Sequence, residues 1–195
     1  MQLLVILVAY LLGNFSASYI IGKLTANIDI RNYGSGNAGT TNVMRTLGYK
    51  AAVITLIIDC LKGVLAVYIA RRLGTENLAL VAGVAVVLGH NWPILLGFKG
   101  GKGIATTIGV GLAIHTSAAL ICIVIGIIIL ILFKYVSLAA IIAITLLPII
   151  LAFEGRNYFL FGLILCALAI YRHRENIQRL RNGTERKITE KLKVK

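Results

Sequence analysis

Long apolar runs separated by short polar segments make up most of this chain. A run of about 20 apolar residues crosses the hydrocarbon core of a bilayer as an α-helix, because a helix bonds its backbone polar groups internally. The pattern therefore predicts an all-α polytopic membrane protein. The runs lie at residues 3–21, 51–69, 77–88, 104–132, 135–153 and 158–171.

The run at residues 104–132 is too long for one comfortable crossing. Its 29 residues would form a helix about 43 Å long, whereas the hydrocarbon core is roughly 30 Å thick. His115, Thr116 and Ser117 interrupt the run near its middle and predict a turn. Division into 104–114 and 118–132 gives seven transmembrane helices, and a five-span chain is the alternative.

The distribution of Lys and Arg indicates how the helices are oriented. Cytoplasmic loops of membrane proteins carry an excess of these residues. With seven spans and the N-terminus outside, only Arg71, Arg72 and Arg156 remain outside among the loop cations. We therefore expect an outside N-terminus and a cytoplasmic C-terminus. The cytoplasmic segments would be residues 23–50, residues 89–103, the turn at Lys134 and the tail at 172–195.

Composition agrees with a location in the membrane. Hydrophobic residues make up 58% of the chain and the mean hydropathy is +0.89, whereas about 45–50% is usual for soluble domains. The formal net charge of +13 lies mostly beside apolar runs, which indicates topology and attraction to anionic lipid rather than a nucleic-acid partner. Cys60, Cys122 and Cys166 lie within apolar runs and predict small buried side chains, not disulfides. We expect a single domain, residues 1–195.

The segment GFKGGKG at residues 97–103 is the first candidate for a binding site. Glycines let successive backbone N–H groups converge, lysines add charge, and a helix beginning at Ile104 would direct its positive dipole end toward the loop. These are the features of a phosphate cradle, although the loop lacks the nucleotide-binding pattern G-x-x-x-x-G-K-[ST]. A flexible loop between spans is the alternative. The candidate binding residues are Gly97, Lys99, Gly100, Gly101, Lys102 and Gly103.

A second polar segment, residues 35–45, also has anion-binding potential. We expect Thr41 or Asn42 to cap a helix that carries Arg45 in its first turn. Turn-forming residues would give a similar composition in an ordinary loop, which is the alternative. The candidate residues are Ser35, Asn37, Gly39, Thr41, Asn42 and Arg45.

Polar residues also occur within the apolar runs. Asp59 and Lys62 are three residues apart and therefore share a helix face. Ionisable groups at this depth either pair with each other or serve a function, and the sequence leaves both open. Trp92 suits an anchor at the membrane interface, and Pro93 is expected to end or kink its helix.

The tail after the last apolar run has a pattern of its own. As a continuation of that helix it places His173, Asn176, Ile177 and Leu180 on one face, with Gly183 as a natural stop. His173 and Asn176 would then lie on the same helix face as the apolar residues Ile177 and Leu180, which is expected to pack against the protein. A basic helix on the membrane surface explains the apolar residues and the cations equally well.

Together, the three polar segments resemble the motifs of the bacterial acyl-phosphate:glycerol-3-phosphate acyltransferases, the PlsY family. The resemblance runs from the first span to the tail, and three motifs in order make it specific. The matching residues are Ser35-Gly36-Asn37, Gly39, Thr41-Asn42 and Arg45 in the first motif, His90-Asn91-Trp92-Pro93 with Gly97 to Gly103 in the second, and His173, Asn176-Ile177, Arg179-Leu180, Gly183 and Glu185 in the third.

This resemblance implies an integral membrane enzyme of phospholipid synthesis. It would transfer a fatty acyl group from acyl phosphate to the 1-hydroxyl of glycerol 3-phosphate, releasing lysophosphatidate and phosphate, with no cofactor. The family would place it in the bacterial inner membrane as a monomer, in contact with membrane lipid, with its active site facing the cytoplasm. The second motif would bind glycerol 3-phosphate. Ser35, Arg45, His173 and Asn176 would be catalytic, and Glu185 would be structural.

The chemistry of such substrates narrows the mechanism. Acyl phosphate is an activated mixed anhydride, so placing a hydroxyl near its carbonyl and neutralising two phosphates can supply much of the acceleration. We expect direct transfer without an acyl-enzyme. Ser35 would form a hydrogen bond to a substrate, and Arg45 and Lys102 would bind phosphate groups. A phosphate oxygen of the donor would take the proton of the attacking hydroxyl. His173 as general base is the competing mechanism.

A membrane transporter and a non-catalytic scaffold are the two alternatives to an enzyme. A transporter of phosphate or sugar phosphate would also carry glycines and cations, but such a site usually lies near the midplane between repeated halves. Here only Asn14, Asp59 and Lys62 are deep polar candidates. A scaffold without catalysis would leave the clustered motifs unexplained. No metal site is predicted, because the three histidines are dispersed and lack a carboxylate cluster.

Overall fold

The computed structural model describes residues 1–190, and their regular structure is entirely helical. The last five residues of the basic tail, 191–195, lie outside the described residues. The α-helices are α1 (Gln2–Asn14), α2 (Ala17–Ala26), α3 (Thr40–Leu47), α4 (Tyr49–Leu73), α5 (Glu76–Asn91), α6 (Ile104–Ile114), α7 (Thr116–Phe133), α8 (Val136–Leu151), α9 (Arg156–Arg172) and α10 (Arg174–Arg181), with short 3₁₀ turns η1 (Ile30–Asn32), η2 (Ile94–Leu96) and η3 (Ala152–Glu154).

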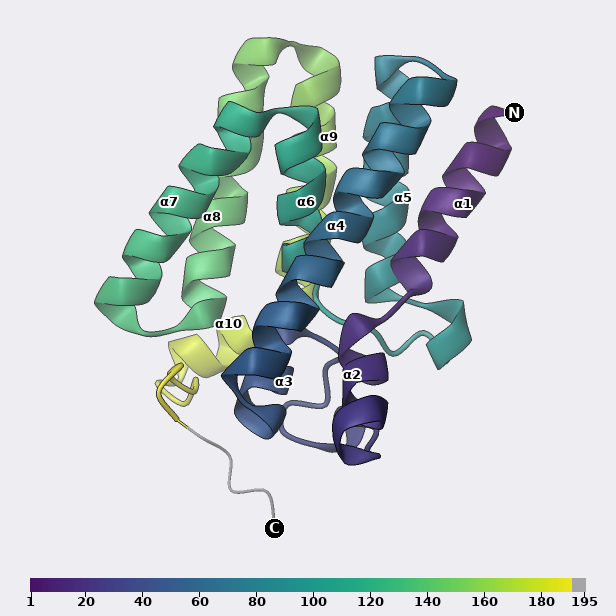
Figure 1. The fold of residues 1–195 in the computed structure, drawn as a ribbon. Coiled ribbons are helices and arrows are strands. Elements are labelled where there is room, and N and C mark those ends of the chain that lie inside the picture. The colour runs from purple at the N-terminus through teal and green to yellow at the C-terminus, as the bar shows by residue number, and fades with distance from the viewer. Residues whose placement is uncertain (191–195) are drawn as a thin grey trace.

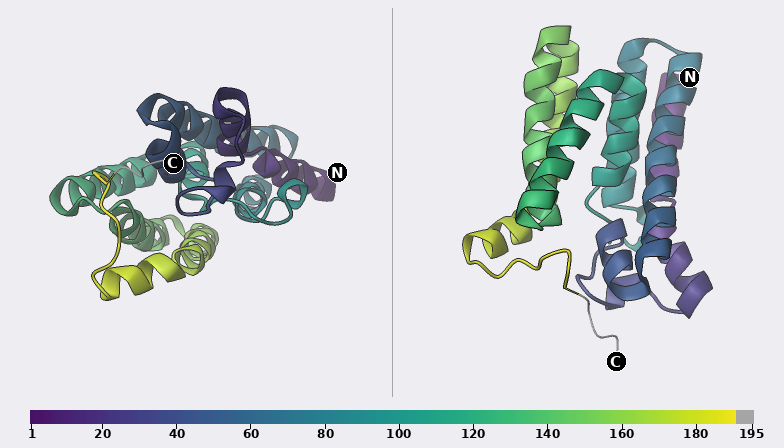
Figure 2. Two further views of the ribbon diagram at one scale, coloured as in Figure 1. Left: turned by 90° about the horizontal axis from the view of Figure 1, so that it is seen from below. Right: turned by 60° about the vertical axis from the view of Figure 1, so that its left-hand side comes forward.

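The helices form a bundle with a cluster of short elements at one end. Helices α1 and α4 to α9 run lengthwise, whereas α2, α3 and α10 lie at the end opposite the N-terminus (Figure 1). The loops that precede α3 and α6 reach the same end (Figure 2). The three polar segments, widely spaced in the sequence, are therefore brought together.

Five segments of the described chain have the length and apolar composition to cross a membrane. They are Gln2–Ala26, Tyr49–Leu73, Glu76–Leu96, Thr116–Phe133 and Val136–Glu154, and α6 is apolar but shorter. Large apolar side chains such as Leu3 and Leu7 on α1, and Val124, Ile128 and Ile131 on α7, are exposed on the outside of the bundle. Outward apolar faces are what lipid contact requires, so the all-α polytopic prediction is confirmed at this level.

Close helix contacts depend on small residues. A Cβ added to Gly89 on α5 would lie 2.1 Å from the carbonyl oxygen of Tyr10 on α1, and one added to Gly109 on α6 would lie 1.9 Å from the carbonyl oxygen of Cys60 on α4. Membrane helices pack in this way because lipid supplies no hydrophobic drive for their association. The three cysteines are free, as predicted, but only Cys122 is fully buried, whereas Cys60 and Cys166 are partly exposed.

The first apolar run is not one continuous helix, and our expectation of an unbroken helix over residues 3–21 was wrong. Helix α1 ends at Asn14, and Ser16 begins α2 by accepting a hydrogen bond from the backbone N–H of Tyr19 at 3.4 Å. The Asn14 side chain also accepts from the backbone N–H of Leu95 at 3.3 Å. Serine is a strong helix start signal, and here it outweighs the continuous apolar pattern.

Two predicted interruptions are confirmed. Helices α6 and α7 are separated by His115, whose Nδ1 accepts from the N–H of Ala118 at 3.2 Å and so caps α7. Helix α5 ends at Asn91, just before Trp92 and Pro93. Proline lacks the N–H that would continue the helix, so the chain turns into the glycine loop at this point.

The tail does not extend the last long helix as we expected. A break at His173 separates α9 from α10, and α10 lies across the end of the bundle (Figure 2). The predicted stop is confirmed, because Gly183 has a φ of +68° and the N–H of Thr184 bonds the carbonyl of Arg179 at 2.8 Å. Glycine adopts this left-handed conformation without steric cost.

Candidate active site

A cavity of about 620 Å³ joins the polar end of the bundle to the space between helices α4 and α6 on one side and α7 and α8 on the other. One end of it carries polar side chains from all three motifs. The remainder is lined mostly by apolar and small residues of the long helices, with Asp59, His90 and Thr107 as further polar residues. The polar lining residues at that end are Ser35, Asn37, Thr40, Thr41, Asn42, Arg45, Lys102, Ser137, His173, Asn176, Arg179 and Glu185.

Asn42 organises the first motif. Its amide group donates to the carbonyls of Ile30 and Tyr33 at 3.0 Å each and to that of Asn37 at 3.1 Å, and its oxygen accepts from the N–H of Ser35 at 2.9 Å. The side chain is 2% exposed. Asn42 therefore fixes the path of the loop that carries Ser35.

The predicted start of the first-motif helix was wrong. Gly39, not Thr41 or Asn42, occupies the capping position, and α3 begins at Thr40 without a side-chain cap. Arg45 consequently lies in the last turn of α3 rather than the first. The Asn42 side chain cannot cap the helix because its hydrogen bonds hold the preceding loop. Arg45 still borders the cavity, where its Nη2 donates to the carbonyl of Arg186 at 3.1 Å.

A network centred on Glu185, which we call the cavity cluster, connects the second and third motifs. Asn176 Nδ2 donates to Glu185 Oε1 at 2.7 Å, and Arg179 Nε donates to Oε2 at 2.7 Å. Ser137 on α8 adds a bond to Oε1 at 2.8 Å. The Lys102 ammonium donates to the Asn176 side-chain oxygen. The cavity cluster is thus Lys102, Ser137, Asn176, Arg179 and Glu185.

The ionisation of this cluster follows from its surroundings. Burial would raise the pKa of Glu185, but hydrogen bonds from Arg179, Ser137 and Asn176 outweigh it and lower the pKa below its ordinary value. Burial, followed by the nearby charge of Arg179, lowers the pKa of Lys102 to about 8. With Arg45, the polar end carries three cationic side chains and one carboxylate, an arrangement that favours anions.

His173 stands at the junction of α9 and α10 with a defined orientation. Its Nδ1 lies 2.8 Å from the carbonyl oxygen of Ala169, which can only accept, so the ring proton is assigned to Nδ1. Burial, with Lys102 as the next contribution, lowers the pKa of His173 to about 4. The imidazole is therefore neutral near pH 7, and Nε2 is an acceptor in a side chain that lines the cavity.

The glycine loop lies against α5 so closely that side chains would not fit. A Cβ on Gly100 would lie 2.0 Å from the carbonyl oxygen of His90, and one on Gly101 would lie 2.2 Å from His90 Nε2. The loop is held by Arg172, whose Nε and Nη2 donate to the carbonyl of Gly101 at 3.0 and 2.8 Å. The guanidinium of Arg172 also lies over the ring of Trp92.

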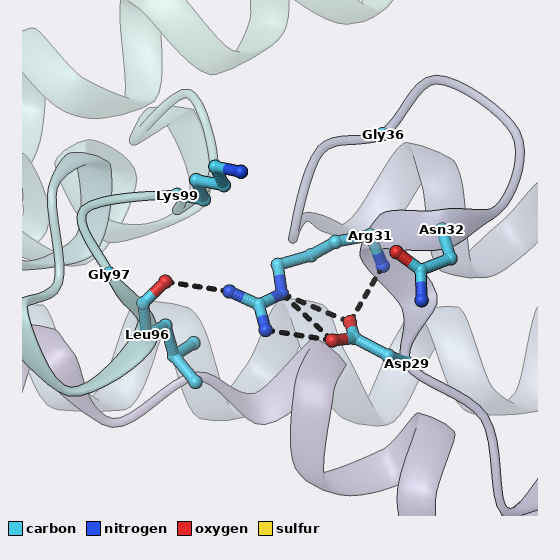
Figure 3. Close-up of a pocket in the computed structure, with 7 residues that line it drawn as sticks. All are labelled: Asp29, Arg31, Asn32, Gly36, Leu96, Gly97 and Lys99. Carbon is cyan, nitrogen blue, oxygen red and sulfur yellow. Dashed lines mark hydrogen bonds and ion pairs between the residues drawn. The ribbon is translucent and has the colours of Figure 1, made fainter.

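The structure does not bring all the predicted loop residues to one place. Lys102 and Gly103 line the main cavity, whereas Gly97 and Lys99 line a separate hollow of about 380 Å³. In that hollow Arg31 grips the Asp29 carboxylate, with Nη2 to Oδ2 at 2.7 Å, and donates to the carbonyl of Leu96 at 2.7 Å (Figure 3). Arg31 therefore connects the loop before the first motif to the loop of the second motif.

Of the two interpretations left open for Asp59 and Lys62, the pairing is confirmed, because they form an ion pair. Lys62 Nζ lies 2.8 Å from Asp59 Oδ1, and both side chains are buried. Sequence reasoning missed Ser137 and Arg172 as parts of the site. Ser137 appeared only as a residue of an apolar run, although a hydroxyl in the first turn after Lys134 was the available signal. Nothing in the sequence indicated that Arg172 would fold back onto the glycine loop.

Among residues 1–190, no group of three or more His, Cys, Asp and Glu side chains lies close enough to hold a metal ion. The polar end of the cavity offers three cations, amides, hydroxyls, the His173 imidazole and the Glu185 carboxylate. Its chemistry is that of anion binding next to an apolar channel.

Comparison with known proteins gives a consistent answer. The family described as glycerol-3-phosphate acyltransferase matches residues 3–183. A glycerol-3-phosphate acyltransferase of Alkaliphilus metalliredigens (strain QYMF) is 62% identical over 193 residues, covering 99% of both chains. That of Clostridioides difficile (strain 630) is 47% identical over 196 residues, covering 97% of this chain and 96% of the relative.

Solved structures agree. The crystal structure of PlsY, an integral membrane glycerol 3-phosphate acyltransferase, in its glycerol 3-phosphate form has a TM-score of 0.91 and 41% identity, covering 95% of this chain and 94% of that one. Its lysophosphatidic acid form has a TM-score of 0.88, with 40% identity and the same coverage. The family, the enzyme class and the acyltransferase function predicted from the three motifs are confirmed. The chain belongs to the glycerol-3-phosphate acyltransferase family.

Proposed function

We propose that the protein transfers an acyl chain from acyl phosphate to the 1-hydroxyl of glycerol 3-phosphate, giving lysophosphatidate and inorganic phosphate. The observation that supports this most directly is a cavity with a cationic end and an apolar channel. Acyl phosphate has the same two-part character, an anion joined to a hydrocarbon chain. Glycerol 3-phosphate adds a second anion, which accounts for the number of cations.

The polar end suggests a role for each candidate residue. Arg45 and Lys102 hold phosphate charge, and Ser35 hydrogen-bonds a substrate from the loop that Asn42 fixes. Asn176 holds the Lys102 ammonium in place through its side-chain oxygen. His173 presents Nε2 as an acceptor, which suits a hydrogen bond from the other hydroxyl of glycerol 3-phosphate.

The proton in this reaction passes to the donor rather than to the protein. The hydroxyl oxygen attacks the carbonyl carbon, the bond from that carbon to the phosphate oxygen breaks, and the proton moves to a phosphate oxygen. His173, with a pKa of about 4, is a weak base at neutral pH and therefore favours this route over general-base catalysis. No covalent acyl-enzyme is formed.

The apolar part of the cavity is the proposed channel for the acyl chain. One face of α7 lines it at helical spacing, and the facing positions on α8 include Ala139, Ala140 and Ala143. A Cβ on Gly126 would lie 3.4 Å from the Cβ of Ala143, so small side chains leave the space open. The lining residues of α7 are Ala119, Cys122, Ile123, Gly126, Ile127 and Leu130.

We also propose that the chain crosses a bacterial inner membrane seven times, with its N-terminus outside and the site on the cytoplasmic side. The support is that α1 and α4 to α9 alternate in direction along the bundle (Figure 1). The basic loops and α10 then share one end, as the excess of cytoplasmic cations requires. The short α6 would cross with help from the loop that precedes it. We propose that the protein acts as a monomer, because side chains of all three motifs reach one cavity within a single chain.

The function can be tested with purified protein in detergent. Glycerol 3-phosphate is mixed with palmitoyl phosphate or palmitoyl-CoA, and inorganic phosphate and lysophosphatidate are followed. We expect product from palmitoyl phosphate alone, lost in Arg45→Ala and Lys102→Ala. Product from palmitoyl-CoA at an equal rate would contradict the proposed donor, and a labelled acyl-protein trapped during turnover would contradict direct transfer. Product from neither donor would refute the proposal, and phosphate uptake into proteoliposomes would then be measured.

A further inference from the structure

Three buried polar residues of the bundle are not used by the proposed mechanism. Asp59 and Lys62 lie on α4 and His90 lies on α5, with exposed fractions of 1%, 5% and 5%. We call them the bundle cluster. Ionised groups at this depth cost free energy unless they are paired and hydrogen-bonded. The contacts of these three residues show how their charges are stabilised inside the bundle.

Lys62 is the centre of the bundle cluster. Its ammonium lies 2.8 Å from Asp59 Oδ1 and 2.8 Å from His90 Nδ1. It also donates to the carbonyl oxygens of Gly13 at 3.2 Å and Phe15 at 2.9 Å. These two carbonyls flank the break between α1 and α2, where backbone acceptors lose their helical partners. Lys62 therefore stabilises the break as well as the ion pair.

The contact between Lys62 and His90 fixes the state of the imidazole. An ammonium has three N–H donors and no acceptor, so His90 Nδ1 must accept and the ring proton lies on Nε2. The three hydrogen bonds of the ammonium go to His90 Nδ1 and the carbonyls of Gly13 and Phe15, and Asp59 Oδ1 adds an ion contact. The Nε2 side of the ring is the side that contacts Gly101.

His90 connects the bundle cluster to the glycine loop through two contacts. Its carbonyl accepts from the N–H of Gly101 at 3.2 Å, and its ring lies where a Gly101 side chain would be. Asp59 and His90 also border the main cavity. A rotation or tautomer change of this ring would displace the segment that leads directly into Lys102.

We propose that the bundle cluster positions the glycine loop for glycerol 3-phosphate, with Lys62 setting the orientation of His90. This proposal rests on the proposed function. Asp59, Lys62 and His90 act as positioning residues that do not touch the reacting atoms. Their loss should weaken binding of glycerol 3-phosphate more than it slows the chemical step.

The test is a double variant, Asp59→Asn with Lys62→Met. Each single variant breaks a buried ion pair and leaves one partner without its counterion, which is strongly destabilising, whereas the double variant removes both charges. We expect its melting temperature to lie closer to wild type than that of either single variant. We expect the KM for glycerol 3-phosphate to rise about 10-fold, with kcat and the KM for palmitoyl phosphate within about twofold.

The matched control removes a different ion pair, one that joins α4 to α5. Arg71 on α4 and Glu76 on α5 pair at 2.6 Å near the other end of the bundle. Arg71→Met with Glu76→Gln should leave all three kinetic constants within about twofold of wild type. A folded Asp59→Asn, Lys62→Met variant with an unchanged KM for glycerol 3-phosphate would overturn the proposal.

A binding measurement separates this proposal from the proposed function. Glycerol 3-phosphate should raise the melting temperature of the wild type, because a ligand that binds the folded state stabilises it. At the same concentration the shift should be smaller in the double variant, or in His90→Gln, which leaves the Asp59–Lys62 ion pair intact, if the double variant does not fold. An equal shift would contradict positioning. Absence of product from the wild type would refute the proposed function instead, while the shift would still test the bundle cluster.

Discussion

The cavity cluster and the bundle cluster both contact the glycine loop, but they differ in charge balance. In the cavity cluster, Lys102 and Arg179 face one carboxylate, Glu185, next to open space. In the bundle cluster, Lys62 is matched by Asp59 and surrounded by carbonyls and His90. An excess of cations attracts anionic substrates, whereas an ion pair with balanced charges only fixes the positions of the residues around it.

The largest expected effect comes from removing the free charge of the cavity cluster. Lys102→Met should lower kcat/KM for both substrates about 100-fold, because its ammonium is available to phosphate. The melting temperature should stay close to wild type, since Lys102 adds to the repulsion with Arg179 and Arg172. Lys99→Met on the same loop provides the comparison, because Lys99 lines the separate hollow. Equal losses for the two lysines would mean that the loop binds substrate through both faces.

Removing the carboxylate should cost activity and stability together. In Glu185→Gln, Arg179 loses its counterion and Ser137 and Asn176 lose a charged acceptor. We expect the melting temperature to fall by about 4–8 °C and kcat/KM to fall about 10-fold. Thermal unfolding and initial rates are measured on the same preparation. A stable variant with full activity would show that Glu185 does not organise the site.

The same residue gives a pH signature. The pKa of Glu185 is lowered in the folded protein, so its contribution to stability is present above its ordinary pKa of 4.5 and is lost as the pH falls below that value. The melting temperature of the wild type should therefore fall more steeply than that of Glu185→Gln between pH 5 and pH 3. Parallel curves would contradict this assignment.

Deprotonation of Lys102 should lower the activity at alkaline pH. Its pKa of about 8 means that the ammonium is lost as the pH rises through that value, and with it the attraction for phosphate. The KM for glycerol 3-phosphate should rise several-fold between pH 7 and pH 9.5 in the wild type. Lys102→Arg, which stays charged, should have a higher KM at pH 7 and a flatter profile. A wild-type KM that is constant over this range would refute the role of the Lys102 charge.

The smallest effect is expected in the apolar channel, where no charge is involved. Gly126→Leu should fill space between α7 and α8 and lower kcat/KM for palmitoyl phosphate about fivefold relative to octanoyl phosphate. Val124→Leu places similar bulk on the lipid-facing side of α7 and should leave the ratio unchanged. Comparable ratios in the two variants would place the acyl chain elsewhere.

Much of this arrangement was predictable because its signals are local. Apolar length predicted the helices, His115 and Pro93 predicted two of the breaks, and Gly183 predicted a helix end. The break at Ser16 was missed because a continuous apolar run conceals a capping residue whose effect depends on Lys62, some 46 positions later. Arg172 and Ser137 were missed for the same reason, since their partners lie far away in the sequence.

The position of Glu185 has a consequence for biosynthesis. It follows the other polar residues of the cavity lining in the sequence, and it joins α8 to α10 through Ser137, Asn176 and Arg179. The long helices can thus enter the membrane and pack while the polar end of the cavity is still incomplete. A nascent chain that stalls before this residue would be an inserted protein without an assembled site, so catalytic competence requires synthesis to pass Glu185.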